Sequence, residues 1–261
     1  MPGKQFTFRA KTANVSMWQQ LGADIVGLAN NHCFDYGEDA FLDTLSTLQG
    51  ANIPYVGAGK NLEEAMQPQF FLVGGMKIGY VACTRAEKYI LTPEAGETSP
   101  GVLRCYDPEL AVQAIQTASE QCDYLVVYVH WGTEGSTVLE QAQTDLATRF
   151  TEAGADLIVG AHPHILQGAG WRKDTPVLYS LCLLYTSVAG RGIVDLHFIH
   201  PGGIHVGLDP VGHGGLLLLQ LGDLSGDLLI FVHCFAQFGL FHGELPFIVE
   251  PPGGHLPDYC P

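Results

Sequence analysis

The chain has 261 residues, of which 47% are hydrophobic, which is enough for the core of one large domain or two small ones. Its formal net charge is −15 and its pI is about 4.9, and this acidity argues against nonspecific binding to nucleic acid or to anionic membrane surfaces. The seven cysteines show no CxxC spacing, so a disulfide framework is not expected. The N-terminus carries no export-signal pattern and no membrane segment is expected, so the chain reads as soluble as written.

Helical and strand patterns alternate along the first 181 residues. The helices are predicted over residues 12–21, 38–49, 108–121 and 139–153, with Asp107 and Asn61 as caps of the third helix and of a further short helix. Strands are predicted over 24–28, 53–56, 70–73, 76–82, 123–129, 156–159 and 176–181, with a Gly74-Gly75 hairpin turn between the third and the fourth. Residues 84–106 read as an irregular loop. This order predicts an α/β fold with mixed sheets and outer helices.

The composition changes near residue 181. All six lysines and five of the six arginines precede it, whereas residues 182–261 hold seven histidines and 14 glycines. We therefore expect a domain over 1–181 and a separate tail over 182–261. The tail is predicted to be a small all-β appendage, a poorly ordered extension, or out-of-frame sequence, and its unevenly spaced histidines are not expected to form a site.

The four histidines before residue 182 lie in three short polar motifs, each directly after an apolar run. They are His32 in Ala29-Asn30-Asn31-His32, His130 in Val129-His130-Trp131-Gly132, and His162 and His164 in Gly160-Ala161-His162-Pro163-His164. Ligands bind outside the carboxyl ends of strands in α/β sheets, and imidazole is the commonest protein ligand for transition metals. The motifs therefore predict a metal site at one edge of the sheet.

The spacing of His162 and His164 is the most specific of these signals. Residues two apart in an extended chain point to the same side, so the two imidazoles are expected to reach neighbouring metal ions, with Pro163 stiffening the turn. Two surface loop histidines are the alternative. The amide oxygen of Asn31 is a further candidate metal ligand, although asparagine is also common in turns.

Further polar residues of the motifs have candidate roles. His130 is predicted to be a ligand rather than a core histidine, and His32 is the candidate catalytic residue, placed to donate a proton to a leaving oxygen. Asp35 is expected either to orient His32 or, more simply, to cap the next helix. Trp131 is expected to pack or to form a wall of the cleft. Glu134 is open to three roles, as a ligand, as an acid or base, or as a residue facing solvent.

Two metal-free alternatives remain open. The first is an α/β hydrolase with a serine nucleophile, for which the chain offers no Gly-x-Ser-x-Gly elbow. The second is thiol chemistry at Cys33, beside His32, where nothing nearby in the sequence is expected to lower the pKa of the thiol.

The motifs together resemble one bacterial family over roughly residues 6–181. The residues that carry the likeness are Ala29-Asn-Asn-His-Cys-Phe-Asp-Tyr-Gly37, His130-Trp-Gly-Thr-Glu134, Gly154-Ala-Asp-Leu-Ile-Val-Gly-Ala-His-Pro-His164 and Pro176-Val-Leu-Tyr-Ser-Leu181. The chain resembles the capsule-synthesis protein CapA family, also called the poly-γ-glutamate biosynthesis accessory proteins. The resemblance implies a calcineurin-like metallophosphoesterase sandwich and a part in making or tethering an anionic capsule polymer.

The resemblance also implies roles for single residues. Asn31, His130 and His162 would serve one divalent ion (manganese, iron, zinc or magnesium), His164 would serve a second, and His32 would assist at the scissile phosphate. The implied partners are other capsule-synthesis components and an anionic polymer or phosphoester substrate. Family members are often exported and tethered to the membrane. A non-catalytic scaffold of capsule export that keeps the fold is the alternative to a metal-dependent hydrolase.

The chain departs from the family pattern at both ends. The family's early Gly-Asp and Asn-Leu-Glu motifs, which supply metal-bridging carboxylates, are not found ahead of His32, and Cys182-Leu-Leu stands where the family has Gly-Asn-Phe. We therefore expect a chain truncated at the N-terminus, with weak or single metal binding and little catalysis on its own.

Overall fold

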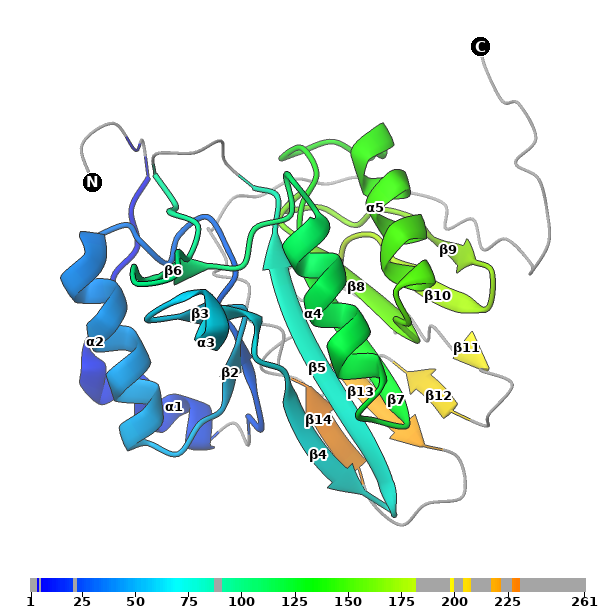
Figure 1. Ribbon diagram of the computed structural model, residues 1–261, viewed down its shortest axis with the longest axis horizontal. Coiled ribbons are helices and arrows are strands. Elements are labelled where there is room, and N and C mark those ends of the chain that lie inside the picture. Colours follow the sequence, from blue (N-terminus) through cyan, green and yellow to red (C-terminus); the bar gives the residue numbers. More distant parts are fainter. Residues whose placement is uncertain are drawn as a thin grey trace, which may run out of the picture.

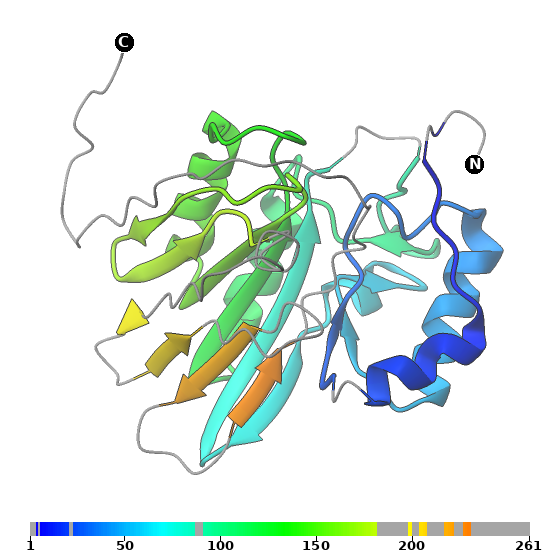
Figure 2. The same cartoon turned by 180° about the vertical axis from the view of Figure 1, so that it is seen from behind.

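The structure is a computed structural model (Figures 1 and 2). It describes residue 4 and residues 6–20, 23–86 and 91–181 with their side chains. It also describes the backbone of four strands at 198–199, 204–207, 217–221 and 227–230. Every residue with a predicted role in the site falls in the first group.

One mixed sheet of six strands forms the centre of the described fold. The strands are β4 (Gln69–Val73), β5 (Met76–Thr84), β7 (Tyr124–His130), β8 (Leu157–Ala161), β9 (Ala169–Arg172) and β10 (Thr175–Leu178). They lie in the order β4-β5-β7-β8-β10-β9, in which neighbours from β5 to β10 run parallel and the two edge strands are antiparallel. Helices flank this sheet, so the predicted mixed α/β class is confirmed.

Two amphipathic helices, α4 (Glu109–Ser119) and α5 (Gln141–Glu152), cover one face of the sheet (Figure 1). The buried side of α4 carries Ala111, Ala114, Ile115 and Ala118, at the spacing of a helix stripe that faces a core. These residues pack with Phe150 of α5 and with Val127 and Val129 of the central strand β7. Strand β7 is buried on both faces, as expected for a parallel strand between layers.

An N-terminal unit packs against the other face of the sheet. Its elements are a 3₁₀ turn η1 (Thr12–Asn14), α1 (Val15–Gln20), β1 (Val26–Gly27), α2 (Gly37–Gly50) and β2 (Tyr55–Val56). Phe41 and Leu45 of α2 share a core with Tyr128 of β7. A Cβ on Gly27 would lie 2.8 Å from the Tyr128 ring, so glycine allows β1 to approach β7 closely. This contact brings the loop that follows β1 to the end of β7.

Most predicted elements are present, with shorter or shifted bounds. Residues 12–21 divide into η1 and α1, and the remaining short elements are α3 (Leu62–Met66), β3 (Ala58–Gly59) and β6 (Gly101–Val102). Asn61 caps α3 through a 2.9 Å bond to the Glu64 amide. Gly74 and Gly75 both have positive φ, as in the predicted two-residue hairpin.

Two expectations about local structure were wrong. Pro108 is the residue before α4 rather than its first residue, because the helix begins at Glu109. The loop at 84–106 is not wholly irregular, since β6 lies in it and pairs with β3. Strands of two residues give too short a pattern to be found from sequence.

The tail contains a four-stranded antiparallel sheet in the order β11-β12-β13-β14 (Figure 2). Its strands are β11 (Phe198–Ile199), β12 (Ile204–Gly207), β13 (Leu217–Leu221) and β14 (Asp227–Ile230). The side chains of the seven tail histidines lie outside the described residues, so the expectations for the tail and the division near residue 181 stay predictions. Within the described residues, none of the helices has the length and apolarity to span a membrane.

Candidate metal centre

The ends of three parallel strands bring His130 and His162 together. In the register of the sheet, Thr84 of β5 pairs with His130 of β7, and His130 pairs with Ala161 of β8. His162 is the next residue after β8, and its ring centroid lies 4.8 Å from that of His130. Both side chains are buried, at 8% and 7% exposure. The expected convergence at the carboxyl edge of the sheet is therefore present.

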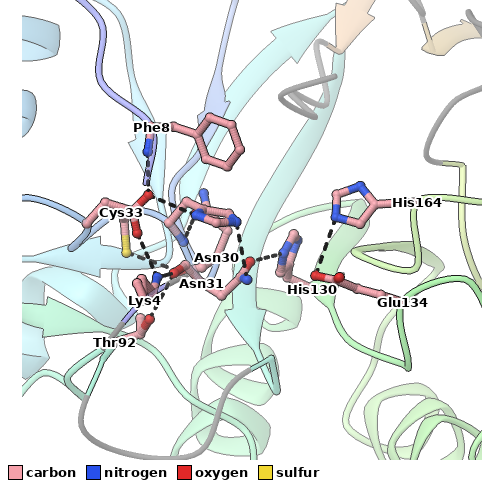
Figure 3. A network of polar contacts seen from close by, with 11 residues as sticks. Lys4, Phe8, Asn30, Asn31, Cys33, Thr92, His130, Glu134 and His164 are labelled. Atoms are coloured by element: carbon pink, nitrogen blue, oxygen red, sulfur yellow. Dashed lines mark hydrogen bonds and ion pairs between the residues drawn. The ribbon is translucent and has the colours of Figure 1, made fainter. Parts of the chain in front are cut away.

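Asn31 joins this pair from the loop after β1. It is buried, and its Oδ1 lies 2.9 Å from Nε2 of His130 (Figure 3). On the other side its Nδ2 lies 3.4 Å from Nε2 of His32. The separation of the Asn31 oxygen and the His130 nitrogen is a hydrogen-bond distance, and because an amide oxygen only accepts, Nε2 of His130 is the donor.

Asp35 holds the imidazole of His32. Its Oδ2 lies 2.9 Å from Nδ1 of His32, and the carboxylate also accepts from Lys4 Nζ and from the backbone N–H of Phe8, both at 2.7 Å. The Phe8 ring packs edge-on against the His32 ring. Of the two roles predicted for Asp35, the structure shows the orientation of His32. The capping role was wrong, because α2 follows Tyr36 and has no side-chain cap.

Two contacts to the Asn31 backbone were not anticipated from the sequence. The carbonyl oxygen of Asn31 accepts from Lys4 Nζ and from Thr92 Oγ1 (Figure 3). Arg104 in turn donates to the Thr92 carbonyl. The Lys4 side chain is only 3% exposed. A lysine near a chain end is ordinarily solvated, so its sequence gives no signal of this buried position.

The turn that carries His162 and His164 is not extended, contrary to the sequence-based expectation. His162 has a φ of 101° and His164 a φ of 59°, both in the left-handed region that side chains other than glycine rarely adopt. Their ring centroids are 5.9 Å apart. Backbone strain of this kind costs roughly 1–3 kcal/mol per residue and persists where function or the surrounding structure requires it.

Glu134 reaches the same turn from the loop after β7. One of its carboxylate oxygens lies 3.6 Å from Nε2 of His164 (Figure 3). Ligand atoms of Glu134, His162 and His164 all lie within 4.8 Å of one another. Of the three roles predicted for Glu134, the structure agrees with the solvent-facing one, since its side chain is 59% exposed, and it also places the carboxylate near His164 and His162.

Trp131 points away from this cluster. Its side chain is fully buried in the core beneath α4 and α5, and its Nε1 donates to the Tyr179 carbonyl at 2.9 Å. Adjacent residues of a strand face opposite sides of the sheet, so Trp131 must turn to the core when His130 turns to the site. Of its two predicted roles, the structure shows packing.

The buried imidazoles are neutral at physiological pH. Burial, reinforced by the neighbouring His164 and His32, lowers the pKa of His162 to about 4. Burial, reinforced by His162 and other histidines, also lowers the pKa of His130 well below 6.5. Nδ1 of each ring is buried and has no hydrogen-bond partner among the described residues. Such atoms call for an unseen ion or water, and imidazoles beside an amide oxygen and a carboxylate fit a divalent cation.

The surroundings of Cys33 disfavour its reactive thiolate form. Burial raises the pKa of its thiol to about 12, and its Sγ donates to the Asn30 carbonyl at 3.1 Å. Because the thiolate is the reactive form, the alternative of thiol chemistry loses its support.

The low pKa of His162 predicts acid lability of the metal-free chain. The unfolded chain binds the proton near pH 6.5, whereas the folded chain binds it only near pH 4. The free energy of unfolding should therefore be flat above pH 6.5 and fall as the pH is lowered toward 4, by about 3 kcal/mol from this residue. Urea unfolding in chelator, compared between wild type and His162→Gln, measures this. An equal pH dependence in the two proteins would contradict it.

The comparisons with known proteins agree on one family. Residues 1–185 match the family described as "Bacterial capsule synthesis protein PGA_cap". Over 182 residues the chain is 32% identical to the capsule biosynthesis protein CapA of Bacillus anthracis, covering 68% of this chain and 44% of that protein. It is also 32% identical to the PGA biosynthesis protein CapA of Bacillus subtilis (strain 168), covering 68% and 46%. The chain thus spans just under half the length of these relatives.

Among solved structures, the NAD nucleotidase of Haemophilus influenzae superposes with a TM-score of 0.41 at 16% identity, covering 84% of this chain and 41% of that one. This likeness is too distant to support a statement about activity. The sequence matches, in contrast, extend through all three histidine motifs. The chain belongs to the bacterial capsule synthesis protein family PGA_cap.

Proposed function

We propose that this chain takes part in the synthesis or tethering of an anionic surface polymer, poly-γ-glutamate or a related one, through a divalent-metal site of the phosphoesterase type. The relatives from two Bacillus species are named as capsule and PGA biosynthesis proteins, and more distant relatives from Mycobacterium tuberculosis are named as polyglutamine synthesis accessory proteins. These names support the polymer, and the chemistry of the site supports the reaction type.

The observation that carries the proposal is the convergence of four side chains that offer ligand atoms, from three distant parts of the sequence. Asn31, His130 and His162 are all more than nine-tenths buried and lie side by side, with His164 at the open end of the row. We assign the first three to one cation and His164 to a second. Neutral buried imidazoles with free ring nitrogens are ready ligands, because they need no deprotonation before they bind.

His32 is the proposed general acid. Its Nδ1 is bonded to Asp35, which fixes the ring and leaves Nε2 on the side of the Asn31 amide. A bound divalent cation would polarise a phosphoryl oxygen and help to form the attacking hydroxide. The protein's contribution is to hold the His32 ring through the contact of Nδ1 with Asp35, so that Nε2, once protonated, can give its proton to the leaving oxygen. A group placed in this way typically contributes 10²- to 10⁴-fold to a rate.

The negative charge of the chain makes binding of an anionic substrate depend on bound metal ions. The chain carries a formal net charge of −15, so its overall field repels an anionic polymer or phosphoester. Bound cations at the centre would supply the local positive charge that such a substrate requires. We expect other components of the capsule-synthesis machinery to be its partners.

The proposal predicts slow hydrolysis that depends on a divalent metal. Purified chain would be stripped with chelator and assayed on generic phosphodiesters and phosphomonoesters before and after Mn²⁺ is added back. We expect turnover only with Mn²⁺, because the cation supplies the Lewis acid and the nucleophile. The His130→Ala variant should lose it.

The outcomes separate three classes of function. Metal-dependent turnover that is lost in His130→Ala supports the hydrolase. Turnover that persists in chelator contradicts the metal site and favours a metal-free hydrolase. Absence of turnover at every metal concentration, both in this chain and in a protein extended upstream through the Gly-Asp and Asn-Leu-Glu motifs, contradicts the hydrolase and favours a scaffold of capsule export that keeps the fold.

A further inference from the structure

Glu134 is held beside the His162–His164 turn by the backbone. The loop after β7 turns through Gly132 and Gly135, whose φ values of 87° and 71° lie in the left-handed region. The Gly135 amide then donates to the Pro163 carbonyl at 2.8 Å, between the two histidines. This hydrogen bond joins the loop after β7 to the His162–His164 turn, so that the Glu134 carboxylate lies at the edge of the histidine cluster.

An ion pair with His164 does not account for this placement. The 3.6 Å separation of the two side chains is too long for a hydrogen bond. His164 is 35% exposed and Glu134 is 59% exposed, and pairs of this kind contribute little to stability. An ordinary surface contact would also not explain the positive φ values of His162 and His164 in the turn.

His162, the third residue grouped with Glu134 and His164, indicates that the group binds a ligand. His162 is buried, and its Nδ1 has no partner among the described residues. Imidazole and carboxylate are both common donors to zinc and similar ions. The three ligand atoms lie within 4.8 Å of one another, whereas ligands ~2.1 Å from one tetrahedral ion lie ~3.4 Å apart. The partly exposed side chains of Glu134 and His164 need to move only slightly to close the set.

The other carboxylate of the cluster is committed elsewhere. Asp35 accepts from Lys4, from the Phe8 amide and from His32, all on the far side of Asn31 from His162. Glu134 therefore brings negative charge to the end of the cluster where Asp35 does not reach.

We propose that Glu134 is a metal ligand, which joins His164 at the second divalent-cation position of the centre, at its border with His162 of the first. This inference deepens the proposed function and rests on it, since it requires that the centre binds metal. The position adjoins the Asn31–His130 pair, so that Glu134 supplies the carboxylate of a site otherwise made of neutral donors.

The first test is the affinity for Mn²⁺ of the full chain, measured by isothermal titration after chelator treatment. The Glu134→Gln variant keeps the shape of the side chain and removes its charge. We expect its affinity to fall at least ~10-fold, since even residues that only support ligands cost ~10- to ~100-fold. Glu152→Gln is the matched control, because Glu152 is an exposed residue of α5 that pairs with Lys173. Its affinity should equal that of wild type.

The second test distinguishes a ligand from a residue that acts through charge alone. In the Glu134→Cys variant loaded with Co²⁺, a coordinated thiolate gives a near-ultraviolet charge-transfer band that wild type lacks. The band supports the inference, and its absence together with unchanged Mn²⁺ affinity in Glu134→Gln overturns it. If wild type binds neither Mn²⁺ nor Co²⁺, the proposed function fails as well. If wild type binds both and Glu134→Gln equals it, only the role of Glu134 fails.

Discussion

Replacement of His162 by alanine is expected to lower the affinity for Mn²⁺ at least ~100-fold and to abolish metal-dependent turnover. His162 lies between His130 and His164, and its ligand atom is grouped with those of Glu134 and His164. It is therefore the one residue that borders both proposed cation positions. Loss of a ligand should exceed the ~10- to ~100-fold typical of supporting residues. Titration calorimetry and a turnover assay on the same preparation measure the two effects.

The matched variant for this prediction is His32→Ala. His32 lies beside Asn31 but is proposed as the general acid and not as a metal ligand. Its loss should therefore reduce turnover by ~10²-fold or more, while the affinity for Mn²⁺ stays near that of wild type. A large loss of metal affinity in His32→Ala would show that the assignment of ligand and acid is wrong. Unchanged metal affinity in His162→Ala would exclude the proposed centre.

Replacement of Gly160 by alanine is expected to destabilise the chain by about 2–3 kcal/mol, because the added methyl group has no space. A Cβ at this position would lie 2.1 Å from the Tyr179 carbonyl oxygen and 2.4 Å from Nε1 of Trp131. The first is backbone of the segment after β10, and the second is held by the hydrogen bond to that same oxygen. Thermal unfolding should show a Tm lower by roughly 4–12 °C.

Gly168→Ala provides the control for this prediction. Gly168 lies in the same region, because its carbonyl oxygen accepts from the Tyr179 amide at 3.2 Å, and a Cβ there would meet nothing within 4 Å. Its Tm should stay close to that of wild type. Equal Tm values for the two variants would mean that the close approach of Gly160 to Tyr179 does not constrain the fold. A further consequence of the Gly160 change is a displaced His162, two residues along, and hence weaker metal binding.

The residues of the predicted site come together where local pattern and sheet topology coincide. Parallel strands end at one edge of a sheet, so polar motifs after β1, β7 and β8 had to come together if the order of elements was read correctly. The register of β7 and β8 then places His130 next to Ala161, and His162 follows. The helices and strands of the central layer are long enough to carry a periodic signal, whereas β3 and β6 are not.

The contacts that orient the site could not be predicted from the sequence. Lys4 and Thr92 hold the Asn31 carbonyl from 27 and 61 residues away, and neither residue type in its local context marks a buried contact. The positive φ values of His162 and His164 also could not be expected, since an extended turn is the ordinary geometry for such residues. The position of Glu134 follows from the same turn, through the bond between Gly135 and Pro163.

The sequence by itself determined the α/β class, the family and the residue types at the site, because these depend on periodicity and on short motifs that can be recognised in the linear sequence. The tertiary structure decided which role each polar residue has. Asp35 orients His32 and does not cap a helix, Trp131 packs in the core, and Glu134 faces two imidazoles. The physical reason is that these roles depend on contacts between residues distant along the chain, which only packing of the layers creates.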